Sequence, residues 1–359
     1  MADSAEWTIL NILQRRRPVH VKTTIPNDLP EECLVHVLEN LQFHEICNIA
    51  RVCKRFYQVS WNPTLWKSID LSSVYAFPIS GNLVYLSQMM TFPKRRMLLA
   101  LFLSARRAAL TDIHGDIDIY REAGMFLCLL INCNVRNLQT VKLRLPFGTN
   151  YHTYMPSGQE LQTFQDVLRC LVQKCSNVLK SLKCYVDISY TTAKLLGSLH
   201  SLEYLNLQYV SPSWRSDLPY LHPKSIDAIL SLPNLKYLKM SISQFISENK
   251  YFPGYVLQSD SLEELDFGFT KQFIIKKLLF PKLHTLKAES PHKIFHMSDS
   301  KRVAVCLFDV VERGCPLIQT LNDYTSLVPG LQNFNLSDIQ KRDLYFCNCS
   351  LHAPSRFNH

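Results

Sequence analysis

A short phrase of the form L-x-x-L-x-L recurs along the chain and constrains the fold more than any other feature. Its clear copies are NLQTVKLRL (137–145), SLEYLNLQY (201–209), NLKYLKMSI (234–242), SLEELDFGF (261–269) and KLHTLKAES (282–290). Weaker copies are VLKSLKCYV (178–186) and LIQTLNDYT (317–325). The alternation of apolar residues in these copies predicts short strands with one buried face.

The central apolar positions of these copies are Val141, Leu182, Leu205, Leu238, Leu265, Leu286 and Leu321. Their intervals are irregular, and segments with helical periodicity lie between them, such as FQDVLRCLVQKC (164–175) and VAVCLFDVVERGCP (303–316). The second of these segments ends at Gly314, with Pro316 beyond. The expected helix faces are Phe164, Val167, Leu168, Leu171 and Val172, and then Val303, Cys306, Leu307 and Val310.

These patterns predict an α/β stack, with parallel strands on one side and helices on the other. The alternative is an ordinary α/β domain in which leucine pairs recur through composition. Two earlier segments, SIDL (68–71) and LLALFL (98–103), are also predicted as strands. In the second of them Leu99, Leu101 and Leu103 alternate. The short basic runs RRR (15–17) and KRR (94–96) are interpreted as solvated surface rather than as a localisation signal or a phosphate-binding patch.

The stretch PNDLPEECLVHVLENL (26–41) sets a second constraint. Asp28 is a candidate N-cap, Pro30 fits a first helical turn, and Glu31 and Glu32 complement the positive end of the helix dipole. Two apolar helical stripes follow: Leu34, Val37, Leu38 and Leu41, then Ile46, Ile49, Ala50 and Cys53. The following segment VCKRFYQVS (52–60) supplies a third short helix. Three short helices bury too little surface to form an independent core, so part of their apolar surface is expected to contact a partner or the rest of the chain. The alternative is an ordinary helical cap on a larger domain.

The segment from residue 29 to residue 69 resembles an F-box. It keeps the family's order and spacing in Leu-Pro-Glu-Glu (29–32), the apolar helix, Val-Cys-Lys-Arg-Phe (52–56) and Leu-Trp-Lys (65–67). Phe56 is a departure, because many family members carry Trp there. The resemblance implies a module that docks on the small Skp-type adaptor of SCF (cullin-RING) ubiquitin ligases. The rest of the chain would then hold a substrate for ubiquitination and proteasomal degradation.

Carried over residue by residue, the resemblance assigns an adaptor face to Leu29, Pro30, Leu34, Val37, Leu38, Ile46, Val52 and Cys53. Phe56, Leu65 and Trp66 could belong to that face or to the internal core. The recurring phrase is similar to leucine-rich repeats, but the usual Asn or Cys after L-x-L is missing. The matching positions hold Pro146, Val210, Ser243, Thr270 and Pro291, so the expected solenoid is irregular.

The resemblances together predict an F-box/leucine-rich-repeat substrate receptor. We expect an N-terminal extension at 1–25, a three-helix F-box at 26–70, an α/β leucine-rich-repeat solenoid at 71–342 and a C-terminal tail at 343–359. One alternative is an adaptor-binding scaffold or regulator without a role in ubiquitin transfer. Another is an enzyme with an unrecognised pocket in the solenoid.

Polar residues between the strand anchors would line the concave face. Their central row is Lys142, Lys183, Asn206, Lys239, Asp266, Lys287 and Asn322. Lysines stacked about 5 Å apart would repel one another unless an acidic or phosphorylated partner neutralised them. The candidate substrate-binding residues are Lys142, Arg144, Lys183, Tyr204, Tyr237, Lys239 and Lys287. The alternative is a solvated face without a special partner.

Other motifs argue against catalysis. The ten glycines form no G-x-G loop, and neither G-x-S-x-G nor H-E-x-x-H occurs. CNCSLH (347–352) and HKIFH (292–296) lack the further ligands of a metal site. We therefore expect no catalytic residue, no cofactor and no metal.

The amino-acid composition limits the cellular compartment and the classes of partner that we expect for this protein. Twelve cysteines without an export signal indicate reduced thiols, which predicts a cytoplasmic or nuclear protein. The longest apolar run, MLLALFL (97–103), is far shorter than the roughly 20 residues that span a membrane, so no membrane partner is expected. The net charge of +9 permits acidic partners but does not indicate nucleic-acid binding, and none is expected.

Overall fold

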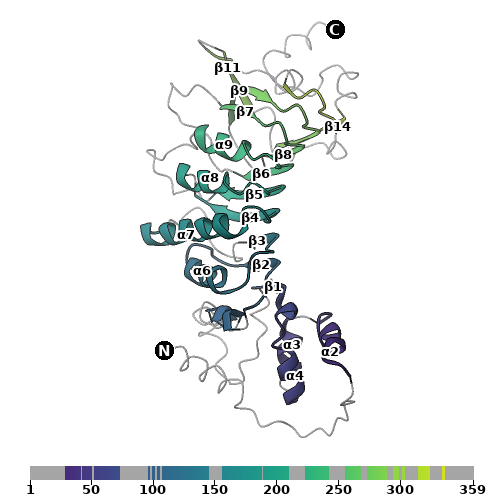
Figure 1. The fold of residues 1–359 in the computed structure, drawn as a ribbon. Coiled ribbons are helices and arrows are strands. Elements are labelled where there is room, and N and C mark those ends of the chain that lie inside the picture. The colour runs from purple at the N-terminus through teal and green to yellow at the C-terminus, as the bar shows by residue number, and fades with distance from the viewer. Residues whose placement is uncertain are drawn as a thin grey trace, which may run out of the picture. The chain divides into compact units, whose positions relative to one another are not determined.

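The structure is a computed structural model (Figure 1). It describes residues 29–41, 43–50, 52–72, 96–97, 99–101, 103–105, 107–144, 156–187, 189–209, 223–241, 255–267, 273–288, 294–298, 301–303, 314–323 and 334–335. The chain forms two compact units, Met1–Phe147 and Gly148–His359.

The first unit begins with the predicted helical segment. Its elements are α2 (Glu31–Leu38), α3 (Phe43–Ile49), α4 (Lys54–Val59) and the 3-10 helix η1 (Pro63–Trp66). Glu31 and Glu32 lie in the first turn of α2, as expected. Pro30 is the N-cap residue rather than part of that turn, and its own side chain forms no capping hydrogen bond. The proposed cap Asp28 lies outside the described residues.

The first unit also contains three parallel strands and the helix α6 (Ala123–Asn132), of which Ala123, Met125, Phe126, Leu129 and Leu130 are buried. The strands are β1 (Ser68–Asp70), β2 (Asp112–Asp116) and β3 (Thr140–Arg144). Their register aligns Ile69, Ile113 and Val141, all fully buried. Strand β1 confirms the prediction for SIDL (68–71).

The strand predicted at 98–103 is wrong, because residues 99–101 and 103 are helical. Leu99 and Leu103 are buried one helical turn apart, whereas Leu101 is 37% exposed. Burial of residues i and i+4 with exposure of i+2 is the pattern of a helix face. The buried face of this helix contains Leu99, Ala100 and Leu103. The leucines alternate in the sequence only because the exposed Leu101 lies between them.

In the second unit, the recurring phrases form a sheet of parallel strands. Its order is β4 (Ser181–Val186), β5 (Tyr204–Tyr209), β6 (Tyr237–Ser241), β8 (Glu264–Asp266), β10 (Thr285–Ala288), β13 (Thr320–Asp323) and the antiparallel β14 (Phe334–Asn335). The predicted anchors share one register: Leu182, Leu205, Leu238, Leu265, Leu286 and Leu321. The mixed α/β fold with parallel strands is thereby confirmed.

Helices cover one side of the first strands of this sheet (Figure 1). They are α7 (Gly158–Cys175), α8 (Tyr190–Leu196) and α9 (Pro223–Leu230). The Ser157 hydroxyl and the Glu160 carboxylate form a capping box that begins α7. Four residues of its predicted face are buried, namely Phe164, Val167, Leu168 and Leu171, while Val172 is half-buried.

Beyond β6, strands take the place of these helices. They are β7 (Tyr255–Gln258), β9 (Phe273–Leu279), β11 (Ile294–Ser298) and β12 (Lys301–Val303), and they form a second sheet in the order β12-β11-β9-β7.

The helix predicted to run from Val303 to Gly314 is wrong at Val303, which ends β12. Cys306, Leu307 and Val310 lie outside the described residues. Gly314 is helical and precedes the turn at Pro316. A Cβ on Gly314 would lie 1.9 Å from the Leu278 carbonyl oxygen, so only glycine allows this close approach.

Candidate functional site

The helical segment of residues 29–66 leaves apolar side chains on its surface. Val37 is 59% exposed, Val52 53% and Leu29 37%, and Pro30 and Cys53 are also exposed. Leu29 and Pro30 precede α2, and Val37 lies in its last turn. Val52 and Cys53 directly precede α4. Apolar groups left in water favour association with a partner that covers them.

The other residues of the predicted adaptor face are buried within the chain. Leu34 is 5% exposed, Leu38 1% and Ile46 2%. Leu34 and Leu38 lie one helical turn apart, whereas Val37 is rotated by about 100° from Leu38 and reaches solvent. The apolar stripe predicted from the sequence thus has a buried row, Leu34 and Leu38, and an exposed flank, Val37.

The structure assigns two of the three residues that the sequence left between the adaptor face and the internal core. Leu65 and Trp66 belong to the internal core, with 8% and 1% of their surface exposed. The Trp66 indole Nε1 donates a hydrogen bond to the Ser60 carbonyl oxygen at 3.0 Å, which satisfies its only polar group. Phe56 is half-buried on α4.

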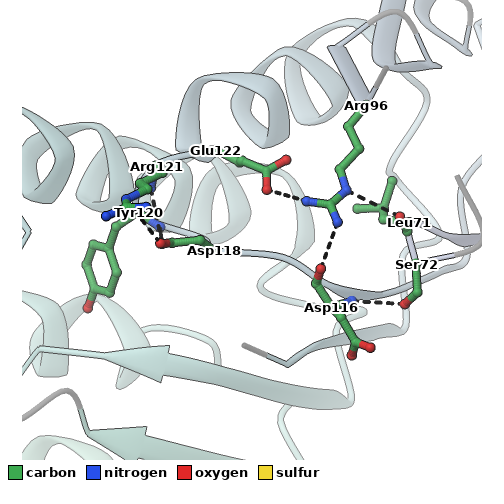
Figure 2. Close-up of polar contacts among 8 residues, drawn as sticks. All are labelled: Leu71, Ser72, Arg96, Asp116, Asp118, Tyr120, Arg121 and Glu122. Atoms are coloured by element: carbon green, nitrogen blue, oxygen red, sulfur yellow. Dashed lines mark hydrogen bonds and ion pairs between the residues drawn. The ribbon is translucent and has the colours of Figure 1, made fainter. Parts of the chain in front are cut away.

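A buried arginine, Arg96, links Leu71, which follows β1, to Asp116 at the end of β2 (Figure 2). Arg96 is 2% exposed; its Nε donates to the Leu71 carbonyl oxygen at 3.4 Å and its Nη2 to that of Asp116 at 2.9 Å. The Asp116 amide in turn donates to the Ser72 hydroxyl at 2.9 Å. The solvated reading of the KRR run is therefore wrong for Arg96, because carbonyls and an acid compensate its charge inside the unit.

That acid is Glu122, which forms a buried ion pair with Arg96. Burial raises the pKa of the Glu122 carboxyl, and this effect outweighs the lowering by Arg96. Its second oxygen, Oε2, has no hydrogen-bond donor within the described part of the chain. The sequence signal for this pair was weak, since nothing connects residues 96 and 122 in the chain.

The strands of the second unit carry the predicted polar row. Their register aligns Lys183, Asn206, Lys239, Asp266, Lys287 and Asn322, as expected. Lys239 Nζ lies 2.7 Å from Asp266 Oδ2, and Lys287 pairs with Glu264. The premise that these lysines need an outside acid is wrong for Lys239 and Lys287, because the neighbouring strand supplies one to each.

Two tyrosines of the predicted substrate set lie beside this row. The rings of Tyr204 and Tyr237 stack with centroids 4.3 Å apart and planes within 2° of parallel. Burial raises the pKa of the Tyr237 hydroxyl, because it disfavours the charged phenolate. The neighbouring Tyr204 and Asp266 raise it further by electrostatic repulsion. Tyr237 therefore presents a neutral phenol. In the first unit, Lys142 and Arg144 are exposed on β3.

The described cysteines are free thiols. Burial raises the pKa of Cys175, Cys184 and Cys315 to about 12, so these three remain protonated and pack as small apolar groups. Among the described residues, no three His, Cys, Asp or Glu side chains gather as metal ligands. Within the same part of the chain, no helix has the length and apolar character needed to cross a membrane.

Comparison with known families gives one match. The sequence model of the F-box-like family matches residues 26–72, the range that contains α2, α3, α4, η1 and β1. F-box-like domains are typically non-catalytic modules that bind a Skp-type adaptor. The match ends at Ser72, whose hydroxyl accepts the hydrogen bond from Asp116.

Proposed function

We propose that this protein is the substrate-recognition subunit of an SCF-type (cullin-RING) E3 ubiquitin ligase. The F-box-like segment (26–72) would dock on a Skp-type adaptor, and through it on a cullin and a RING subunit. The strand-rich part, by which we mean the predicted solenoid at 71–342, would hold a protein substrate. The observation that carries the proposal is the F-box-like match at 26–72, in which Leu29, Val37 and Val52 are exposed. Such a subunit is non-catalytic and acts by raising the local concentration of substrate.

The adaptor face consists of two layers in this proposal. Leu29, Pro30, Val37, Val52 and Cys53 would touch the adaptor, because each of them is exposed. Beneath them, the buried Leu34, Leu38 and Ile46 would hold the helices in place without direct contact. The adaptor contact is then mostly apolar, and its affinity should change little with salt.

The strand-rich part would act as an irregular leucine-rich-repeat solenoid. The shared register of the leucine anchors and the helices on one side of β4, β5 and β6 support this reading. Lys142 and Arg144, exposed on β3, are the groups that would attract an acidic or phosphorylated segment of the substrate. The site of action would be cytoplasmic or nuclear, and the domain limits predicted from the sequence stay a prediction.

The decisive experiment measures binding of the full chain to a purified Skp-type adaptor. Val37→Asp and Val52→Asp should each weaken binding at least about tenfold, because a charge would be buried in an apolar contact. Leu317→Asp is the matched control, since Leu317 is 51% exposed and lies outside residues 26–72. No binding by the unmodified chain, or equal effects of all three variants, would reject the proposal.

A reconstituted ligase separates the proposal from its alternative. The complete complex should transfer ubiquitin to a protein that the strand-rich part retains, and the Val37→Asp variant should stop that transfer. Adaptor binding without any transfer to retained proteins would favour a scaffold or regulator instead.

A further inference from the structure

A side chain of α4 holds the backbone at the start of α2. The Arg55 guanidinium donates a hydrogen bond from Nη2 to the carbonyl oxygen of Leu29, which lies 26 residues earlier in the chain. The next residue, Pro30, is the N-cap of α2, and its carbonyl oxygen accepts a hydrogen bond from the Leu34 amide at 3.3 Å. Arg55 therefore binds the backbone directly before the helix begins, and it does so from a different helix.

This hydrogen bond connects two exposed parts of the proposed adaptor face that are distant in the sequence. Leu29 and Pro30 form one part, and Val52 and Cys53, directly before α4, form the other. Arg55 lies in the first turn of α4, close to the second part. The bond from this turn to the Leu29 carbonyl oxygen therefore ties the backbone of the first part to the helix that begins at the second.

Leu29 needs such a bond more than the exposed residue of α2 does. Val37 lies within the helix, whose backbone fixes the direction of its side chain. Leu29 precedes the N-cap and so lies outside the helical hydrogen-bond pattern, although its side chain is 37% exposed. The peptide group that joins Leu29 to Pro30 is planar, so a donor on the carbonyl oxygen of Leu29 fixes the orientation of that whole group.

We propose that Arg55 is a positioning residue for adaptor docking, and that its hydrogen bond holds Leu29 and Pro30 in the conformation that the adaptor binds. The inference rests on the proposed function and assigns to Arg55 a role through the backbone rather than through its charge. A surface that is already held in its bound conformation loses less conformational freedom on binding. Without the bond, a smaller fraction of the molecules presents Leu29 correctly, and the apparent dissociation constant rises in inverse proportion to that fraction.

The test measures the affinity of the full chain for a purified Skp-type adaptor in the variants Arg55→Met and Lys54→Met. Each variant removes one positive charge from the first turn of α4, and Lys54, the matched control, is exposed. We expect a loss of about fivefold for Arg55→Met, which corresponds to one net hydrogen bond, and less than about twofold for Lys54→Met. Equal losses for the two variants, or unchanged binding by Arg55→Met, would overturn the inference.

The salt dependence separates positioning from a direct ionic contact with the adaptor. The Arg55 bond lies within the chain, so the loss for Arg55→Met should be the same at low and at high salt. A direct contact between Arg55 and an acidic group of the adaptor would be screened by salt. A loss that is seen at low salt and disappears at high salt would therefore contradict the positioning role.

Amide hydrogen exchange in the free chain separates positioning from a general effect on the fold. The Leu34 amide, which donates to the Pro30 carbonyl oxygen, should exchange faster in Arg55→Met. The Glu39 amide at the other end of α2 donates to the Val35 carbonyl oxygen at 2.8 Å, and its exchange should not change. Faster exchange at both amides would show that Arg55 stabilises the whole helix and would contradict the inference. If the unmodified chain does not bind the adaptor, the proposed function itself fails, whereas equal binding by Arg55→Met rejects the positioning role alone.

Discussion

The helical segment of residues 29–66 and the sheet of the second unit present opposite kinds of surface. In the helical segment, Val37 and Val52 are more than half exposed although other apolar residues form a core. In the sheet, the anchors Leu182, Leu205, Leu238, Leu265 and Leu286 are at most 1% exposed, and the open face is polar with paired charges. The first region leaves apolar side chains in water, whereas Lys239 and Lys287 of the second region find carboxylate partners on a neighbouring strand. The two surfaces therefore differ in what a contacting molecule would meet, which is apolar carbon in one case and paired charges in the other.

The largest effect should come from breaking the attachment between the F-box-like segment and the strands that follow it. Arg96→Met leaves Glu122 buried without its cation and removes the hydrogen bonds to the Leu71 and Asp116 carbonyls. We expect the free energy of unfolding to fall by about 3–5 kcal/mol, measured by urea denaturation. Amide hydrogen exchange should also increase in β1, because its end is held by this arginine.

Lys67→Met is the matched control for the arginine variant. Its ammonium pairs with Glu39 at 3.3 Å, but its side chain is 52% exposed, so solvent screens the pair. We expect a change below about 1 kcal/mol. Equal losses for the two variants would show that burial does not set the strength of these ion pairs.

A second pair of variants tests the comparison of surfaces directly. Leu205→Ala should lower the free energy of unfolding by about 2–5 kcal/mol, because Leu205 is fully buried between β4 and β6. Val37→Ala should change it by less than about 0.5 kcal/mol, since its side chain is 59% exposed. Calorimetry of both variants provides the measurement. A large loss for Val37→Ala would mean that the exposed flank serves the fold rather than a partner.

The sequence predicted the strands of the main sheet, because each strand is formed by a short phrase with alternating apolar residues. The anchors at Leu205 and Leu238 lie in register because each phrase forms a strand with alternating faces. The same logic failed for Leu99, Leu101 and Leu103, where a period of two could not be distinguished from a helical row with one exposed member. The replacement of helices by β7 and β9 was not predicted, because which layer covers a sheet depends on packing partners distant in the chain.

The candidate sites show the same limit. Motif spacing identified the segment with Val37 and Val52, but burial of Leu34 beside the exposed Val37 required the packing of α2 in three dimensions. The lysine row was placed correctly, whereas its compensation by Asp266 depends on a neighbouring strand 27 residues further along the chain. Side-chain pairing between such distant residues leaves no periodic signal in a single sequence.

The smallest expected effect is on the pH dependence of the free energy of unfolding. The buried Glu122 and the more exposed Glu203 should contribute to this dependence with opposite signs. Burial raises the folded-state pKa of Glu122 above its ordinary value of 4.5. The folded protein therefore binds this proton more tightly than the unfolded chain does, and the resulting stabilisation is fully present below pH 4.5. It is lost as the pH rises through the folded-state pKa, because the folded protein then gives up a proton that it holds more tightly than the unfolded chain does. The free energy of unfolding of the unmodified chain should therefore decrease relative to Glu122→Gln over this range.

Glu203 provides the control of opposite sign. Lys236 has the larger effect and Lys180 the smaller one, and both lower the pKa of the Glu203 carboxyl. The Glu203 side chain is 38% exposed, so solvent screens both pairs. Its contribution is present above pH 4.5 and is lost as the pH falls through the folded-state pKa, so the unmodified chain should gain stability relative to Glu203→Gln as the pH rises. Urea denaturation of both variants between pH 3 and pH 8 measures the two slopes. Slopes of the same sign would show that Arg96 outweighs burial at Glu122, because its pKa would then be lowered as well.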